Sequence, residues 1–184
     1  AVNHDSDNSQ NWLSLARVSE QLVGAQVEGA YENAQKAYEQ AIVENPTNPL
    51  FPFRLSQLAV ARGDIAAAET YLTQALTLKP NFAAALFLAS QISVAKNDLP
   101  TALLTARAAA QAAPQEPVAW FQLGGLLIQA GDAQNAALAL EQAVALNGNY
   151  ANALYLLSLS YNQLGRKDDA IRAMQRVLEL NPGN

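Results

Sequence analysis

Apolar residues recur along this chain with the spacing of an α-helix, in short segments separated by turn residues. In the segment 151–182 they lie three or four positions apart, as on one face of a helix, at Leu154, Leu157, Tyr161, Ala170, Met174 and Val177. Gly165 lies between the two halves of this segment and can adopt the left-handed backbone that ends a helix. Asn181-Pro182 cannot continue the second half. The pattern predicts two short amphipathic helices joined by a tight turn.

The same pattern recurs every 34 residues toward the N-terminus. The turn residues at this period are Gly165, Gly131, Asn97, Gly63 and Gly29. A small residue always follows five positions later, at Ala170, Ala136, Ala102, Ala68 and Ala34. The residues that terminate each unit are Pro182, Gly148, Pro114, Pro80 and Pro46. A fixed period of this length indicates that one helix-turn-helix unit is stacked repeatedly.

Close helix crossings and helix caps are also periodic. Small residues at Ser56, Ser90, Gly124 and Ser158 are expected to face Ala68, Ala102, Ala136 and Ala170 where the two helices of each unit cross. An aspartate at or beside the turn is expected to cap the second helix in three units, at Asp64, Asp98 and Asp132. These features predict a tightly packed antiparallel helix pair in each unit.

The first unit departs from the period in its first helix. Counting back 34 residues places Gln21 at a core position, whereas a shift of six residues places apolar or small residues there. The shifted positions are Trp12, Leu15, Ala16 and Ser19. We therefore expect six additional residues, near Val23 to Glu28, between the two helices of this unit. Residues 1–8 are polar without periodicity, so they are expected to form a flexible lead-in.

The repeat resembles the tetratricopeptide repeat, whose pattern is Trp-x2-Leu-Gly-x2-Tyr followed by Ala, Phe, Ala and Pro. The unit 117–150 carries it as Trp120, Leu123, Gly124, Leu127, Ala136, Leu140 and Ala143, with Gly148 in place of Pro. The resemblance implies an all-α fold, a right-handed superhelical solenoid of five helix-turn-helix repeats with a concave face lined by the first helices. A single domain is expected over 9–184, with repeats at 9–48, 49–82, 83–116, 117–150 and 151–184.

Composition and charge exclude most catalytic chemistry. The chain has no cysteine, and its one histidine, His4, lies in the lead-in, so we expect neither an enzyme nor a metal or cofactor site. The net charge of -5 argues against a nucleic-acid partner, which requires a basic surface. No apolar run approaches the roughly 20 residues of a membrane span. The chain opens on Ala1 rather than Met, so a preceding segment could have been removed.

The resemblance implies a partner-binding groove on the concave face. The fifth position of each unit is large and apolar, at Leu13, Phe53, Phe87, Phe121 and Tyr155. Adjacent groove positions carry Gln57, Gln91, Ile128 and Asn162, with Val94 and Gly125 beside them, and charges only at Arg17 and Glu20. One interpretation is an apolar, amide-lined groove whose partly exposed rings bind a protein or peptide segment. The other is that the rings merely shield the inner edge of the core.

Three functions follow from these patterns. The first is a non-enzymatic scaffold that binds a protein or peptide segment in the groove. The second rests on the segments 11–17 and 29–34, which are similar to the first repeat in the soluble domain of O-antigen-ligase-like membrane proteins of candidate-phylum bacteria. That resemblance implies an extracytoplasmic domain of a protein of cell-surface polysaccharide assembly, whereas the first function leaves the compartment, cytoplasmic or extracytoplasmic, open.

The third function is a self-associating structural module. No polar capping helix follows Pro182 in this sequence, so Ile171, Val177 or Leu178 is expected to expose apolar surface on the last helix. A second copy of the chain could cover that surface. The sequence therefore also predicts homo-association through the uncapped C-terminal helix.

Overall fold

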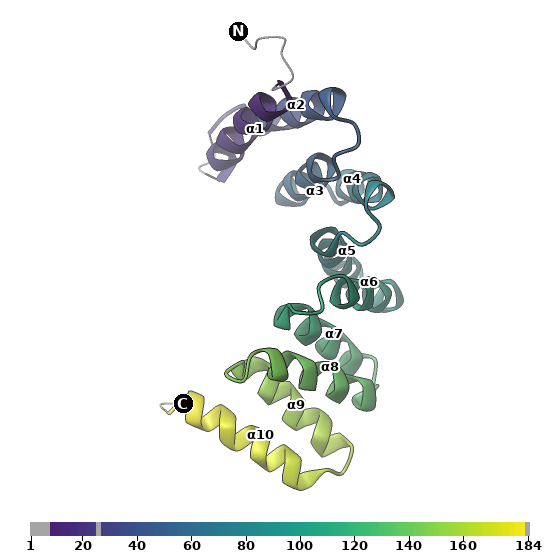
Figure 1. Ribbon diagram of the computed structural model, residues 1–184, viewed down its shortest axis with the longest axis vertical. Helices are drawn as coiled ribbons and strands as arrows, with labels where there is room; N and C mark the ends of the chain where they lie inside the picture. The colour runs from purple at the N-terminus through teal and green to yellow at the C-terminus, as the bar shows by residue number, and fades with distance from the viewer. Residues whose placement is uncertain (1–7, 25–26, 183–184) are drawn as a thin grey trace. The chain divides into compact units, whose positions relative to one another are not determined.

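A computed structural model of the chain describes residues 8–24 and 27–182, which form α-helices and, within those ranges, no strand (Figure 1). The helices are α1 (Asn8–Gly24), α2 (Ala30–Glu44), α3 (Leu50–Arg62), α4 (Ile65–Leu78), α5 (Ala83–Ala95), α6 (Leu99–Ala112), α7 (Pro117–Gln129), α8 (Ala133–Leu146), α9 (Ala151–Gln163) and α10 (Lys167–Leu180). This order confirms the predicted all-α class of helix-turn-helix repeats. The chain divides into two compact units, Ala1–Ala85 and Leu86–Asn184, which are described separately below. The single domain expected over 9–184 stays a prediction.

All five predicted turn residues have a left-handed backbone. The positive φ angles belong to Gly29, Gly63, Asn97, Gly131 and Gly165. Among these, Asn97 has a φ of 58° and is the one that carries a side chain. Asparagine tolerates this region better than other residues with a Cβ, because its short polar side chain can bond locally. The 34-residue period therefore located every turn within a repeat.

The three predicted aspartate caps are confirmed. Carboxylate oxygens of Asp64, Asp98 and Asp132 accept backbone N–H groups at 3.0, 3.2 and 3.1 Å, at the starts of α4, α6 and α8. The last repeat differs, since its cap position is Arg166 and no side chain there caps α10. Two acidic residues in the first turn, Asp168 and Asp169, instead meet the positive end of the α10 dipole.

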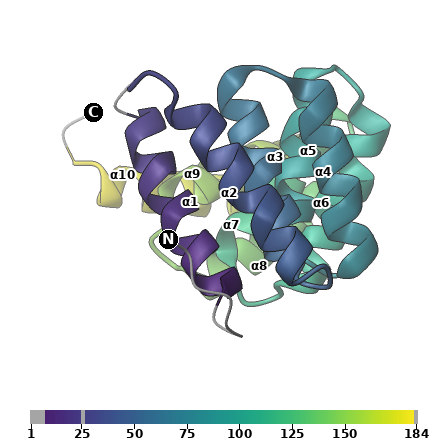
Figure 2. The ribbon, with the colours of Figure 1, turned by 90° about the horizontal axis from the view of Figure 1, so that it is seen from above.

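The core of the first unit lies where α1, α2 and α3 meet, and Figure 2 shows α1 beside α2. Its buried members are Leu13, Ala16, Ala34, Ala37, Tyr38, Ala41, Phe51, Leu55 and Leu58. Four of these are alanines, which allow the helix backbones to approach closely. The predicted contact position Ala68 in α4 is also fully buried.

The core of the second unit follows the predicted small-residue contacts. The Ser90 hydroxyl donates to the carbonyl oxygen of Ala102 at 3.0 Å, which ties α5 to α6. A Cβ at Gly124 would lie 2.5 Å from Cγ of Leu140, so only glycine fits this crossing of α7 and α8. Ala102 and Ala136 are fully buried as predicted, whereas Ala170 is only half-buried. The prediction of full burial is therefore wrong for Ala170, because no further helix in the described chain covers this side of α10.

The predicted insertion in the first repeat is partly wrong. Val23 and Gly24 were expected between the helices, but they continue α1, which has 17 residues where α3 has 13. Val23 packs against the core of the first unit, so extending the helix buries an apolar side chain. Residues 25–26 lie outside the described part. The predicted lead-in is one residue too long because α1 begins at Asn8, and residues 1–7 also lie outside the described part.

A larger side chain at a helix contact should destabilise the protein. We predict that Ala102→Leu lowers the free energy of unfolding by about 1–3 kcal/mol, because the added atoms have no space between α5 and α6. Urea denaturation measures this change. The control Ala95→Leu lies at an exposed position at the end of α5 and should change stability by less than about 0.5 kcal/mol. Equal effects of the two substitutions would contradict close packing at Ala102.

Removing the cap of α8 should destabilise the protein in a pH-dependent manner. Hydrogen bonds from the Asn135 side chain and then its backbone N–H lower the pKa of Asp132. A lowered folded pKa means that the stabilisation is present above the unfolded pKa of about 3.9 and is lost as pH falls through the folded pKa. We expect Asp132→Ala to cost about 0.5–2 kcal/mol near neutral pH.

The stability difference between wild type and Asp132→Ala should therefore shrink below a pH of about 4. Urea denaturation across an acidic pH series measures it. Asp132→Asn is the matched control, because asparagine also caps helices but does not titrate. A difference for Asp132→Ala that stayed constant to the lowest pH would contradict a charged cap.

Candidate functional site

The first unit places two of its predicted groove residues in the core. Leu13 and Phe53 are only 6% and 7% exposed. Leu13 packs into the cluster formed by α1, α2 and α3, and the Phe53 ring lies 4.9 Å from the Phe82 ring, centroid to centroid. The expected partial exposure is therefore wrong for these two residues, because neighbouring apolar side chains cover them. Arg17 and Gln57 are exposed, as a groove position requires.

Charged side chains surround a buried tyrosine in the same unit. The Tyr38 hydroxyl is buried and makes no hydrogen bond of normal geometry with any described residue. Burial raises the pKa of Tyr38, and the carboxylate of Glu20 raises it further, while Arg54 and Arg17 oppose the shift. Arg54 donates from Nη1 to Oε1 of Gln57 at 3.2 Å. The predicted positions of the first unit thus form a charged surface above a tyrosine, and not an apolar groove.

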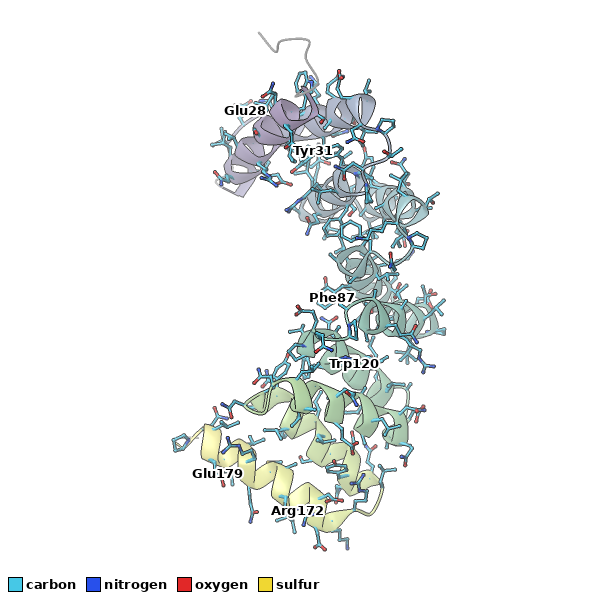
Figure 3. All side chains as sticks on the ribbon, viewed as in Figure 1. Glu28, Tyr31, Phe87, Trp120, Arg172 and Glu179 are labelled. Atoms are coloured by element: carbon cyan, nitrogen blue, oxygen red, sulfur yellow. The ribbon has the colours of Figure 1, made fainter. Side chains whose placement is uncertain are left out.

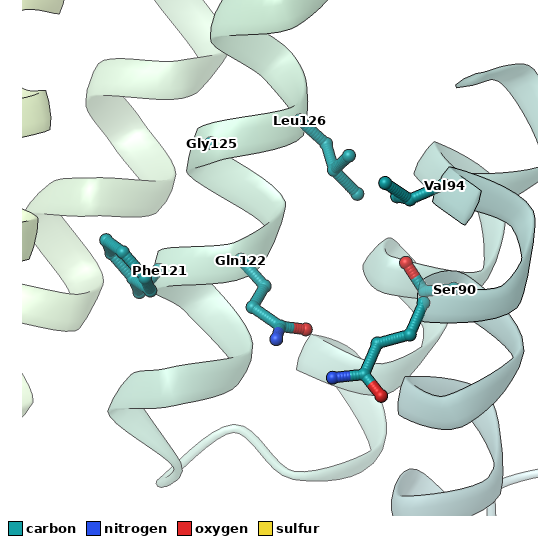
Figure 4. Close-up of a pocket in the computed structure, with 7 residues that line it drawn as sticks. Ser90, Val94, Phe121, Gln122, Gly125 and Leu126 are labelled. Carbon is teal, nitrogen blue, oxygen red and sulfur yellow. The ribbon is translucent and has the colours of Figure 1, made fainter. Parts of the chain in front are cut away.

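The second unit contains an open pocket between α5 and α7 (Figure 4). Its volume is about 420 Å³, and it is lined by Ser90, Gln91, Val94, Phe121, Gln122, Gly125 and Leu126. No charged side chain lines it. Gln91 and Phe121 belong to the predicted groove, and Val94 and Gly125 lie at the groove positions beside them. The structure therefore brings together these four positions from two successive first helices.

The pocket exists because two glutamines occupy positions that are packed in the next repeat. Between α7 and α9, Cδ1 of Leu156 lies 3.8 Å from where a Cβ on Gly125 would be. The residues 34 positions earlier are Gln91, equivalent to Gly125, and Gln122, equivalent to Leu156. A contact between a glycine and a leucine is thus replaced by two amide side chains, which line opposite walls of the pocket.

The amides are the polar groups that this pocket offers to a ligand. The Ser90 hydroxyl already donates to Ala102, and the Phe121 ring packs 4.9 Å from the Tyr150 ring, centroid to centroid. Glutamine amides both donate and accept hydrogen bonds. Side chains of Phe121, Val94 and Leu126 supply apolar surface. The site can therefore hold an apolar group next to a peptide-like backbone, without ion pairing.

The remaining predicted residues of the second unit lie elsewhere. Asn162 lines a separate cavity of about 370 Å³ between α9 and α10. Tyr155 is exposed on α9, and Ile128 is partly buried against the core. Phe87 is half-buried on α5, where Figure 3 labels it. These residues line no part of the pocket between α5 and α7.

Sequence reasoning missed Ser90, Gln122 and Leu126 as pocket residues. Ser90 was interpreted only as a helix contact, and Leu126 lies at a position that is apolar in most repeats. Gln122 had a usable signal, since the residues 34 positions before and after it are Leu88 and Leu156. A polar residue at a position that is apolar in both neighbouring repeats marks a place where packing is interrupted.

Other kinds of site find little support in the described structure. Residues 8–24 and 27–182 contain no cluster of carboxylate, histidine or cysteine side chains that could hold a metal ion. Within the same ranges, no helix combines the length and apolar character needed to cross a bilayer. His4 lies outside the described residues. The arrangement that remains is an uncharged binding pocket on stacked helix pairs.

Stacked helix pairs with a 34-residue period define a helical-repeat protein. The tetratricopeptide repeat family model matches residues 53–117 and 121–184. The chain therefore belongs to the tetratricopeptide repeat family, as its sequence pattern predicted. A search of curated proteins found no significant match.

Solved structures show the same fold. A crystal structure of MamA has a TM-score of 0.77 at 17% identity, covering 97% of this chain and 94% of that one. MamA from Desulfovibrio magneticus RS-1 has a TM-score of 0.74 at 18% identity, covering 100% and 99%. YrrB, described as a TPR protein with an unusual peptide-binding site, has a TM-score of 0.76 at 15% identity, covering 98% and 88%. None of these matches tests the resemblance to O-antigen-ligase-like proteins, which stays a prediction.

The burial of the aromatic row should separate core rings from surface rings. We predict that Phe53→Ala costs about 3–5 kcal/mol of unfolding free energy, as for a core phenylalanine. Tyr155→Ala should cost about 1 kcal/mol or less, because nearly half of its surface is already in water. Urea denaturation measures both changes, with Leu140→Ala as the fully buried reference. Similar losses for Phe53 and Tyr155 would contradict their different burial.

Proposed function

We propose that this protein is a non-catalytic scaffold that binds an extended protein segment, with an apolar side chain of that segment held in the pocket between α5 and α7. The tetratricopeptide repeat fold supports a protein–protein interaction scaffold. The observation that carries the finer proposal is the uncharged pocket with two facing glutamines. Its volume of about 420 Å³ is in the range of ligand sites in proteins.

The lining determines the class of segment. Phe121, Val94 and Leu126 favour an aliphatic or aromatic side chain, since its burial removes apolar surface from water. Gln91 and Gln122 can donate to a backbone carbonyl and accept from a backbone N–H of an extended chain. A charged side chain would lose its hydration in this pocket without meeting an opposite charge. The preferred ligand is therefore an extended segment with one uncharged apolar anchor.

Surfaces outside the pocket contribute less to this proposal. Leu13 and Phe53 are buried in the first unit, so a segment could not contact them without a rearrangement. Arg17 and Gln57 are exposed and remain candidates for polar contacts. Tyr155 on α9 is an exposed aromatic ring that could contact the segment beyond the pocket. YrrB makes peptides the first ligand class to test, because a peptide-binding site is described for that neighbour.

Filling the pocket should abolish peptide binding. We expect a random peptide library selected on the wild-type protein to yield sequences that share one apolar anchor. Gly125→Leu should weaken binding of those peptides at least about tenfold, because the new side chain occupies the pocket. Binding is measured by fluorescence anisotropy with the selected peptides. High salt should leave the affinity nearly unchanged, since no charged residue lines the pocket.

Gly125→Ala is the matched control. It adds a methyl group that makes an ordinary contact at 3.8 Å with Leu156, and it shares the gain in helix propensity. Peptide affinity should fall little in this variant. The proposal fails if no peptide is selected, or if the selected peptides bind Gly125→Leu as tightly as wild type.

A further inference from the structure

Two apolar surfaces of this chain are exposed at places that repeat packing covers elsewhere. The first is the outer side of the last repeat, which we call the α10 face. It surrounds the cavity of about 370 Å³ lined by Ser158, Leu159, Asn162, Lys167, Ala170, Ile171 and Met174. Ile171 in its centre is 56% exposed.

The α10 face has an exact counterpart one repeat earlier, where it is occupied. The residues 34 positions before Ala170, Ile171 and Met174 are Ala136, Ala137 and Leu140. All three are buried, and Ala137 is only 1% exposed. Ala137 and Leu140 form one apolar cluster with Ala153 and Leu157 of α9. The surface around Ile171 thus corresponds to a surface that receives the first helix of a following repeat.

The second surface is a stripe on α1, formed by Leu15, Val18 and Leu22. Leu15 is 46% exposed and Val18 is 56% exposed, and all three lie on one side of the helix. In the register of the first repeat, Leu15 and Val18 correspond to Leu157 and Ser160 of α9. Leu157 is only 4% exposed, because α9 covers α8 with this side. The α1 stripe is thus the covering side of a first helix, with nothing in the described chain beneath it.

We propose that the α1 stripe of one copy packs on the α10 face of a second copy. The two surfaces are complementary because they correspond to the two sides of the contact between α8 and α9 within the chain. The stripe itself carries no charge, so apolar burial drives the association. Because the two surfaces differ, each copy keeps one of them free after pairing. Association is therefore head-to-tail and continues into chains of copies.

Polar residues near the two surfaces agree with this pairing. Inside the chain, the Tyr161 hydroxyl donates to Oε1 of Glu141 across the contact of α8 with α9 at 2.8 Å. The residue equivalent to Glu141 on α10 is Gln175, and the residue equivalent to Tyr161 on α1 is Ser19. An α1 helix on the α10 face therefore leaves no carboxylate buried without its tyrosine. Arg172 and Glu179 project from α10 and remain at the solvent side (Figure 3).

Two surface variants test the pairing. Leu15→Glu combined with Val18→Glu removes the α1 stripe, and Ile171→Glu removes the α10 face; all three residues are exposed, so the helix content by circular dichroism should be unchanged. Sedimentation velocity should show that wild-type mass rises beyond a dimer as concentration increases toward millimolar. Each variant alone should be monomeric. An equimolar mixture of the two should form a dimer and nothing larger, because one intact contact remains.

Leu104→Glu is the matched control, since Leu104 is an exposed leucine on α6, outside both surfaces. It should associate as wild type does. A wild-type protein that stays monomeric up to millimolar concentration overturns the proposal. Dimers formed by either variant alone also overturn it, because they require a contact between like surfaces. Peptide binding to the pocket between α5 and α7 should be unchanged in both variants, so failure of this proposal is distinct from failure of the proposed function.

Discussion

The close crossing of paired helices through small side chains is the interaction on which the rest of the structure depends. Gly124 leaves room for Leu140 of the facing helix, and Ser90 bonds the backbone of α6 at Ala102. Larger residues at these positions would separate the helices and move every side chain on their outer surfaces. Because the same crossing recurs every 34 residues, each pair presents its neighbours with the same geometry. Binding surfaces can then differ between repeats while the backbone does not.

A helix pair of this kind cannot bury all of its apolar surface by itself, and its neighbours supply the cover. Ala137 and Leu140 are buried because α9 lies on them, whereas the equivalent Ile171 and Met174 border a cavity. Exposure at a given repeat position therefore reports on the adjacent helix more than on the residue itself. This dependence explains why the same hydrophobic pattern yields core in one repeat and accessible surface in another.

Turns, caps and helix contacts could be predicted from the sequence because each depends on a residue and its near neighbours. A left-handed backbone selects Gly or Asn, a cap selects Asp, and both occurred at the predicted positions. The burial of Phe53 could not be predicted in the same way, since the covering Phe82 lies between predicted helices and outside the repeat pattern. The extension of α1 to Gly24 was missed because glycine was interpreted as a helix end, although Val23 just before it packs against the core. Local chemistry was thus predicted well, and contacts with connecting segments were not.

The pocket shows how a repeat protein gains a site without changing its fold. A packed contact such as that of Leu156 with Gly125 stabilises one step of the array, by apolar burial. Gln91 and Gln122 give up that contact at the preceding step, yet α5 and α7 keep their places because Ala102, Leu123 and Ala136 still pack beneath them. The loss is local, since each repeat depends mainly on its neighbours. A binding site in such a fold therefore lies where the side chains depart from the repeat pattern and the backbone does not.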